Sequence, residues 1–83
     1  MHRVSIRRRA IKDLSKIPAK YVEQISRNID QLAVESRPTN SKKLKANSGY
    51  SLWIGTYRVL YDIDDNAQHI TIYRIRHRRE SYR

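Results

Sequence analysis

Cysteine is absent from this chain, and long apolar runs are absent as well. Without cysteine there is no disulfide framework and no thiolate zinc site, so a reducing, cytoplasmic setting is expected. No stretch approaches the roughly 18 apolar residues of a membrane span, and the basic N-terminus lacks an apolar segment of signal-peptide length. We therefore expect a cytoplasmic protein without a membrane partner, folded as one domain over residues 1–83.

Acidic residues are scarce. The chain has eight Asp and Glu residues and 18 Lys and Arg residues, which gives a formal net charge of +10. A field of this size attracts polyanions, either nucleic acid or an acidic protein. A membrane surface fits less well, because the basic residues are not confined to one face of a single amphipathic helix. The remaining alternative, a protein that is merely cationic, is disfavoured because so few acids are interleaved.

The first part of the chain shows helical periodicity. Residues 2–6 alternate as in a short strand. Residues 7–17 carry apolar side chains at helical spacing, which predicts a first helix ended by Pro18. Pro18 then fits the first turn of a second helix over residues 19–35. One face of that second helix is apolar and is expected to pack in the core: Tyr21, Ile25, Ile29 and Leu32.

Residues 36–48 are polar and predict one long loop. Long loops in compact domains are often functional, but a solvated lysine-rich surface is an equally good interpretation. From residue 50 the apolar period becomes two, which predicts strands. Tight turns are expected at residues 55–56 and 64–67. They separate three strands, over residues 50–54, 57–63 and 70–75.

The resulting order, β-α-α-β-β-β, is typical of the α+β class. We expect a small antiparallel (mixed) sheet with the two N-terminal helices packed on one face. Such a sheet leaves its other face uncovered. We expect the ligand on this bare, basic face.

The C-terminal segment, residues 58–83, concentrates side chains that suit phosphate chemistry. Arginines hold a phosphate in forked geometry, and a histidine moves a proton near neutral pH. A tyrosine stacks on a base or donates its phenolic proton. This mixture indicates RNA binding and is compatible with RNA cleavage: Arg74, Arg76, His77, Arg78, Arg79, Tyr82 and Arg83.

RNA cleavage needs few groups. A 2′-hydroxyl attacks the adjacent phosphate, a base takes its proton, an acid protonates the leaving 5′-oxygen, and cations stabilise the added charge. Arg58 and Arg78 are the expected phosphate clamp, and Tyr82 is the expected acid or stacking platform. His77 is the expected base, because surrounding arginines disfavour its charged form. The reaction requires no metal or other cofactor.

Other basic residues are expected to bind RNA or an acidic protein partner. They are Lys42, Lys43, Lys45, Arg76, Arg79 and Arg83. Tyr73 is expected to pack within the sheet, as are Tyr57 and Tyr61. Trp53 fits either the core or an exposed stacking platform.

Three segments resemble the RelE/ParE superfamily of toxins from toxin–antitoxin pairs: Leu44-Lys45, residues 55–62 and residues 76–83. The Gly-x-Tyr-Arg-Val-hydrophobic-Tyr and His-Arg-Arg-Glu-x-Tyr patterns are the most specific parts. The resemblance covers nearly the whole chain, and it implies a toxin that is monomeric when free and forms a hetero-oligomer with a cognate antitoxin.

The superfamily implies two activities on one fold. RelE-like members cut messenger RNA in the ribosomal A site, whereas ParE-like members inhibit DNA gyrase without nuclease residues. A third interpretation, a non-enzymatic RNA-binding module, follows from the charge alone. Because the fold is shared, only the residues of the functional site can distinguish between these functions.

The resemblance also implies roles for single residues. Arg58 matches an arginine on the central strand of RelE-like nucleases, and Arg78 matches a basic residue after the last strand. Tyr82 matches a C-terminal tyrosine that stacks on or protonates the substrate. His77 occupies a position that is basic or histidine in relatives.

The chain departs from the superfamily pattern in the expected strand over residues 50–54. Ser51 and Trp53 stand where many relatives carry basic residues. Lys43 and Lys45 lie just upstream and are candidates to replace that charge. The departure keeps the ParE-like alternative open.

Overall fold

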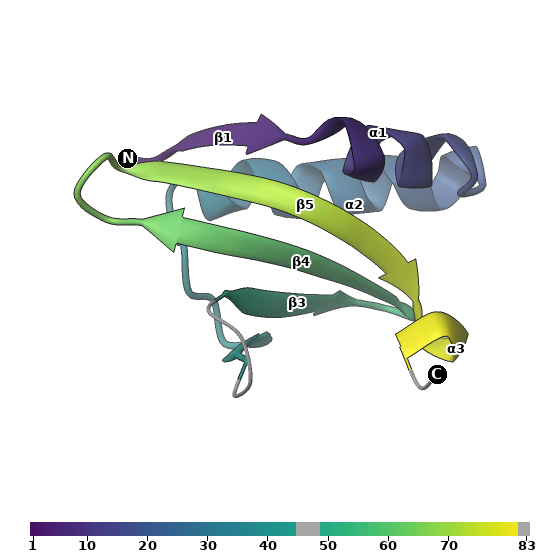
Figure 1. Ribbon diagram of the computed structural model, residues 1–83. Helices are drawn as coiled ribbons and strands as arrows, with labels where there is room; N and C mark the ends of the chain where they lie inside the picture. The colour runs from purple at the N-terminus through teal and green to yellow at the C-terminus, as the bar shows by residue number, and fades with distance from the viewer. Residues whose placement is uncertain (45–48, 82–83) are drawn as a thin grey trace.

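The part of the chain that the structure describes forms one strand, two helices, four strands and a final short helix (Figure 1). The computed structural model describes the backbone of residues 1–44 and 49–81 and the side chains of residues 1–44 and 49–79. In chain order the elements are β1 (Arg3–Ile6), α1 (Arg8–Ser15), α2 (Ala19–Leu32), β2 (Ser41–Lys43), β3 (Tyr50–Ile54), β4 (Tyr57–Asp64), β5 (His69–His77) and α3 (Arg78–Ser81).

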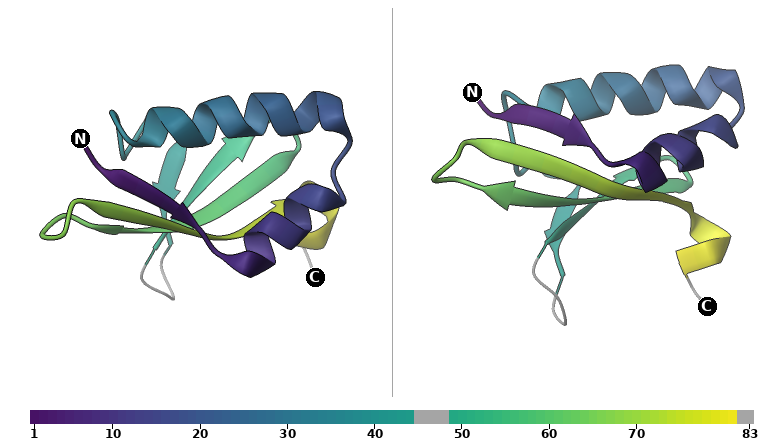
Figure 2. Two further views of the ribbon diagram at one scale, coloured as in Figure 1. Left: turned by 90° about the horizontal axis from the view of Figure 1, so that it is seen from above. Right: turned by 45° about the horizontal axis from the view of Figure 1, so that its top comes forward.

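The strands form one mixed sheet in the order β1-β5-β4-β3-β2. β1 is parallel to β5, and the other neighbours are antiparallel. α1 and α2 lie on the same side of the sheet (Figures 1 and 2). The expected α+β class is therefore confirmed, including two N-terminal helices packed against a small mixed sheet.

The core lies between these helices and the sheet. Alternate residues of the central strands point toward the helices, as a half-buried sheet requires. The predicted apolar face of the second helix is confirmed for three residues, whereas Tyr21 is 38% exposed. The buried cluster contains Ala10, Ile25, Ile29, Leu32, Leu52, Ile54, Val59, Tyr61, Ile70, Ile72 and Ile75.

Several expected boundaries were wrong. Pro18 occupies the N-cap position of α2 and not its first turn. α2 ends at Leu32, three residues before the expected end, and the next carbonyl, that of Ala33, accepts the N–H of His2 at 2.8 Å. This bond fixes the N-terminal strand beside the end of the helix.

The expected loop over residues 36–48 contains an additional strand, β2. Three residues, two of them lysines, give no apolar alternation, so the strand forms by pairing with β3 and not through its own propensity. The short helix α3 was also not predicted.

A polar cluster ties the segment after α2 to the β4–β5 turn. Arg37 donates to the Asp65 carboxylate at 2.9 Å and to the Tyr50 hydroxyl at 3.0 Å. His2 Nε2 lies 3.2 Å from the same carboxylate. These contacts hold the pKa of Asp65 below its usual value, with the Arg37 hydrogen bond as the main cause.

A β-bulge in β5 changes which side chains face the helices. Tyr61 pairs with Ile72, but Leu60 pairs with Arg74, so Tyr73 is an extra residue in β5. Ile72 is buried in the core before the bulge, and Ile75 is buried there after it. The alternation of β5 is therefore inverted beyond Tyr73.

α1 holds this bulge. The Asp13 carboxylate accepts the Arg74 Nε–H at 2.9 Å and the Ile75 backbone N–H at 2.9 Å. The Arg7 N–H donates to the Ile72 carbonyl at 2.8 Å, where β1 has ended. The helix thus supplies the hydrogen bonds that a neighbouring strand would otherwise provide.

Candidate functional site

The sheet surface opposite α1 and α2 is called the open face here. Its centre is a row of three side chains on neighbouring strands, Trp53, Arg58 and Arg76. Arg58 pairs with Trp53 on one side and with Arg76 on the other, and directly paired side chains point to the same face. The Arg58 guanidinium carbon lies 5.8 Å from the centre of the Trp53 ring, in cation–π range.

Two arginine side chains therefore leave directly paired positions on neighbouring strands and share the open face. Like charges directly opposite one another on a sheet repel, and a phosphate between them replaces that repulsion by two attractions. The Nε atom of Arg58 is buried and makes no hydrogen bond with any described group. The row suits an anion with an adjacent flat ring, which is the composition of a nucleotide.

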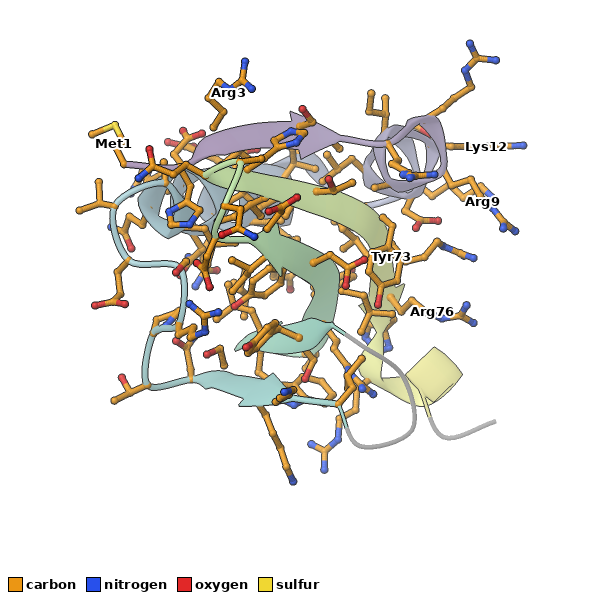
Figure 3. All side chains as sticks on the ribbon, turned by 60° about the vertical axis from the view of Figure 1, so that its left-hand side comes forward. Met1, Arg3, Arg9, Lys12, Tyr73 and Arg76 are labelled. Atoms are coloured by element: carbon orange, nitrogen blue, oxygen red, sulfur yellow. The ribbon has the colours of Figure 1, made fainter. Side chains whose placement is uncertain are left out.

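Tyr73, which was expected from the sequence to pack within the sheet, lies at the open face near Asp62 and Arg58. Figure 3 shows Tyr73 and Arg76 on the same side of β5. Burial raises the pKa of Tyr73, the Asp62 carboxylate raises it further, and Arg58 opposes both. The sequence did contain a signal of the bulge, because the spacing of the apolar residues changes from two to three between Ile72 and Ile75.

Gly49 packs tightly against this part of the open face. A Cβ atom at Gly49 would lie 2.8 Å from Asp62 Oδ1 and 3.0 Å from the Tyr73 hydroxyl oxygen. Its φ of +126° is also a conformation that other residues rarely adopt. The chain therefore approaches Asp62 and Tyr73 closely only because position 49 has no side chain.

His77 lies on the other face of the sheet. Its ring contacts the Tyr57 ring edge-on at 5.2 Å between centroids, and its Nδ1 atom accepts the Arg79 N–H at 3.2 Å. It also lines a cavity of about 320 Å³ beside α1, with Asp13, Lys16, Ile17, Tyr57, Arg74 and Ile75. The structure therefore brings Arg58 together with Arg76 and not with His77, because of the bulge at Tyr73.

The other predicted site residues are more dispersed. Arg78 starts α3, where its N–H donates to the Thr56 carbonyl at 2.7 Å, and Arg79 follows it; both are exposed. Lys42 pairs with Ser51 and shares its face, whereas Lys43 pairs with Tyr50, which faces the helices. Lys45, Tyr82 and Arg83 lie outside the described residues.

Two further observations concern ligands and membranes. Within residues 1–44 and 49–79, no three His, Asp or Glu side chains gather closely enough to hold a metal ion. None of the helices in the described part of the chain has the length and apolar character that crossing a bilayer requires.

Comparison with known proteins identifies the family of this fold. Residues 4–82 match the family described as the ParE toxin of the type II toxin–antitoxin system parDE. The chain belongs to this family, and thus to the RelE/ParE superfamily of type II toxins. The expected superfamily is confirmed. No match was found among curated protein sequences.

Solved structures of RelE proteins are similar over nearly the whole chain. A chain of the RelBE2 toxin–antitoxin complex from Mycobacterium tuberculosis is 30% identical, with a TM-score of 0.83, and 93% of this chain and 98% of that one are covered. A chain of the RelE–RelB complex from Pyrococcus horikoshii is 25% identical, with a TM-score of 0.84 and coverage of 93% and 94%. The isolated RelE toxin of Escherichia coli shares the fold at 16% identity, with a TM-score of 0.79 and coverage of 93% and 84%.

Proposed function

We propose that this toxin is a ribosome-dependent endoribonuclease that cleaves messenger RNA in the A site and arrests translation. The observation that carries the proposal is the paired Arg58 and Arg76 on the open face, with Trp53 in the same row. Cleavage by 2′-hydroxyl attack needs cations at the phosphate and a surface that holds the neighbouring base. This row offers both.

The proposed roles follow the chemistry. Arg58 and Arg76 clamp the scissile phosphate and stabilise its added negative charge, while Trp53 stacks on a flanking base. Arg78 and Tyr82, carried by the C-terminal segment, complete the site as a further cation and as the acid or stacking group. Lys42 and Arg79 bind RNA backbone or ribosome, as do Lys43, Lys45 and Arg83.

We further propose that a cognate antitoxin neutralises this chain in a hetero-oligomer and that the free toxin is monomeric. The similar structures from M. tuberculosis and P. horikoshii are toxin–antitoxin complexes. The net charge of +10 favours an acidic partner. The open face, where Arg58 and Arg76 are paired, is the surface that such a partner would cover.

The test is mapping of transcript ends in a translating extract, with translation on and off. Wild-type toxin should cut within codons only when ribosomes translate. Arg58→Ala combined with Arg76→Ala should lower the cleavage rate by about 10²–10³-fold, the usual effect of removing charge-stabilising groups. Arg27→Ala is the matched control, because Arg27 is an exposed arginine on α2 paired with Glu23.

Cleavage that is unchanged in the double variant, in protein that remains folded, would contradict the proposed site. Cleavage without translation would contradict the ribosome requirement.

A second candidate is a ParE-like inhibitor of DNA gyrase. Two observations favour it, the family match to a ParE toxin and the uncharged Ser51 and Trp53. Such a toxin inhibits supercoiling by purified gyrase and leaves messenger RNA intact. A gyrase assay run beside the cleavage assay separates the two functions, because each predicts a positive result in only one of them.

A further inference from the structure

The chain changes direction where β5 ends at His77 and α3 begins at Arg78. α1 and α2 lie above the sheet, whereas α3 lies below its end (Figure 2, right). Residues Arg78–Ser81, which form α3, therefore leave the side of the sheet on which the His77 side chain lies and run toward the other side. Arg78 and Arg79 are carried by this segment.

The His77 side chain bonds to the backbone at this change of direction. Its Nδ1 accepts the N–H of Arg79, the second residue of α3, at 3.2 Å. An N-cap side chain makes the same kind of bond to the second or third helical N–H. Because Nδ1 is the acceptor, the proton of the neutral ring is on Nε2.

The ring itself is held by aromatic neighbours. Tyr57 contacts it edge-on at 5.2 Å, and the Tyr57 ring lies 5.7 Å from that of Tyr21 on α2. The chain of contacts thus runs from α2 through β4 to the start of α3. A second anchor, the Arg78 N–H bonded to the Thr56 carbonyl at 2.7 Å, fixes the same point of the backbone.

We infer that His77 is a positioning residue: its Nδ1 caps α3 and thereby directs α3 toward the open face. Its part in cleavage rests on the proposed function, but its hold on α3 does not. A histidine acting as general base must reach the proton that it removes. His77 lies on the face opposite Arg58 and Arg76, so its effect on the site passes through the segment that it holds.

The test compares His77→Asn with His77→Leu in the full chain. Asparagine is a preferred N-cap residue and keeps a side-chain acceptor, but it cannot take a proton at neutral pH. Leucine keeps apolar contact with Tyr57 and has no acceptor. His69→Asn is the control, because it makes the same replacement at the opposite end of β5. His69 is the first residue of that strand and bonds to Ser5 Oγ at 2.7 Å.

Two measurements are made on each variant: hydrogen exchange of the Arg79 amide, and ribosome-dependent cleavage. Leucine should speed Arg79 exchange about tenfold, as expected for a lost helix cap, and lower cleavage about 10- to 100-fold through misplacement of the segment. Asparagine should stay within about threefold of wild type in both. Thermal unfolding shows whether each variant is folded.

Two results would overturn the inference. If the asparagine variant keeps slow exchange of the Arg79 amide but is as inactive as the leucine variant, His77 takes part in the chemistry of cleavage. A leucine variant with wild-type Arg79 exchange shows that the ring does not hold α3. If the wild-type protein cuts no RNA, the proposed function fails, while the exchange measurement still decides whether His77 positions the segment.

Discussion

Asp13 is the residue whose removal tests most directly how the site is built. Its side chain is 17% exposed and that of Arg74 is 25% exposed. The carboxylate accepts the Arg74 Nε–H and the Ile75 N–H, each at 2.9 Å. It therefore satisfies two donors at the bulge that places Arg76 on the open face.

The cost of Asp13→Ala follows from these contacts. Hydrogen bonds that involve a charged group contribute about 1.5–3 kcal/mol each, and a partly buried donor left without a partner adds to the loss. We expect the free energy of unfolding to fall by about 3 kcal/mol, since both donors lose the same acceptor. For a domain of this size that is a fall of roughly 15 °C in the melting temperature.

The assay is thermal and urea unfolding of the purified toxin. Asp13→Asn, which keeps an oxygen for the Ile75 N–H but loses the charge, should give about half of the loss. Glu23→Gln is the control, because the Glu23–Arg27 pair is exposed on α2 and such pairs contribute only about 0.3–0.5 kcal/mol.

A functional loss should accompany the loss of stability. If the bulge relaxes, β5 returns to simple alternation and Arg76 turns toward the helices. Cleavage by Asp13→Ala, measured well below its melting temperature, should then fall more than that of Asp13→Asn. An Asp13→Ala variant as stable as Glu23→Gln would refute the reasoning about the bulge.

Two further outcomes can be checked by unfolding. Gly49→Ala should lower the free energy of unfolding by about 2–4 kcal/mol, because a Cβ atom clashes there and φ is strained. Gly55→Ala has open space around it and should lower the free energy of unfolding by only about 1 kcal/mol. Equal losses in the two variants would contradict this account of position 49. The Arg37 hydrogen bond lowers the pKa of Asp65, so it stabilises the fold above the ordinary carboxyl pKa, and this contribution disappears as the pH falls through the lower folded-state value. Arg37→Gln should therefore flatten the acid side of the stability–pH curve, and an unchanged acid side would show that the contact contributes nothing.

Local pattern was enough to predict most of the elements and the face of the sheet that the helices cover. The helical spacing of Ile25, Ile29 and Leu32 and the alternation from residue 50 onward are properties of short windows, and tertiary contacts agreed with them. The approximate positions of α1, α2, β3, β4 and β5 were confirmed for this reason. β2 was missed because its pairing with β3, and not its composition, makes it a strand.

The composition of the candidate site was also visible in the sequence, but its geometry was not. Arg58, Arg76 and His77 were identified from their chemistry. Strict alternation from Ile72 would place Arg76 toward the helices and His77 on the open face. The structure has the reverse arrangement, because one extra residue, Tyr73, is accommodated in β5.

That reversal depends on contacts between distant parts of the chain. Asp13 reaches β5 from α1, about sixty residues earlier in the sequence, and supplies the acceptor that the bulged backbone needs. The sequence by itself determined the charge, the types of most elements and the chemical groups. Only tertiary structure decided which of those groups share a face, because a one-residue shift in a strand moves every later side chain to the opposite side.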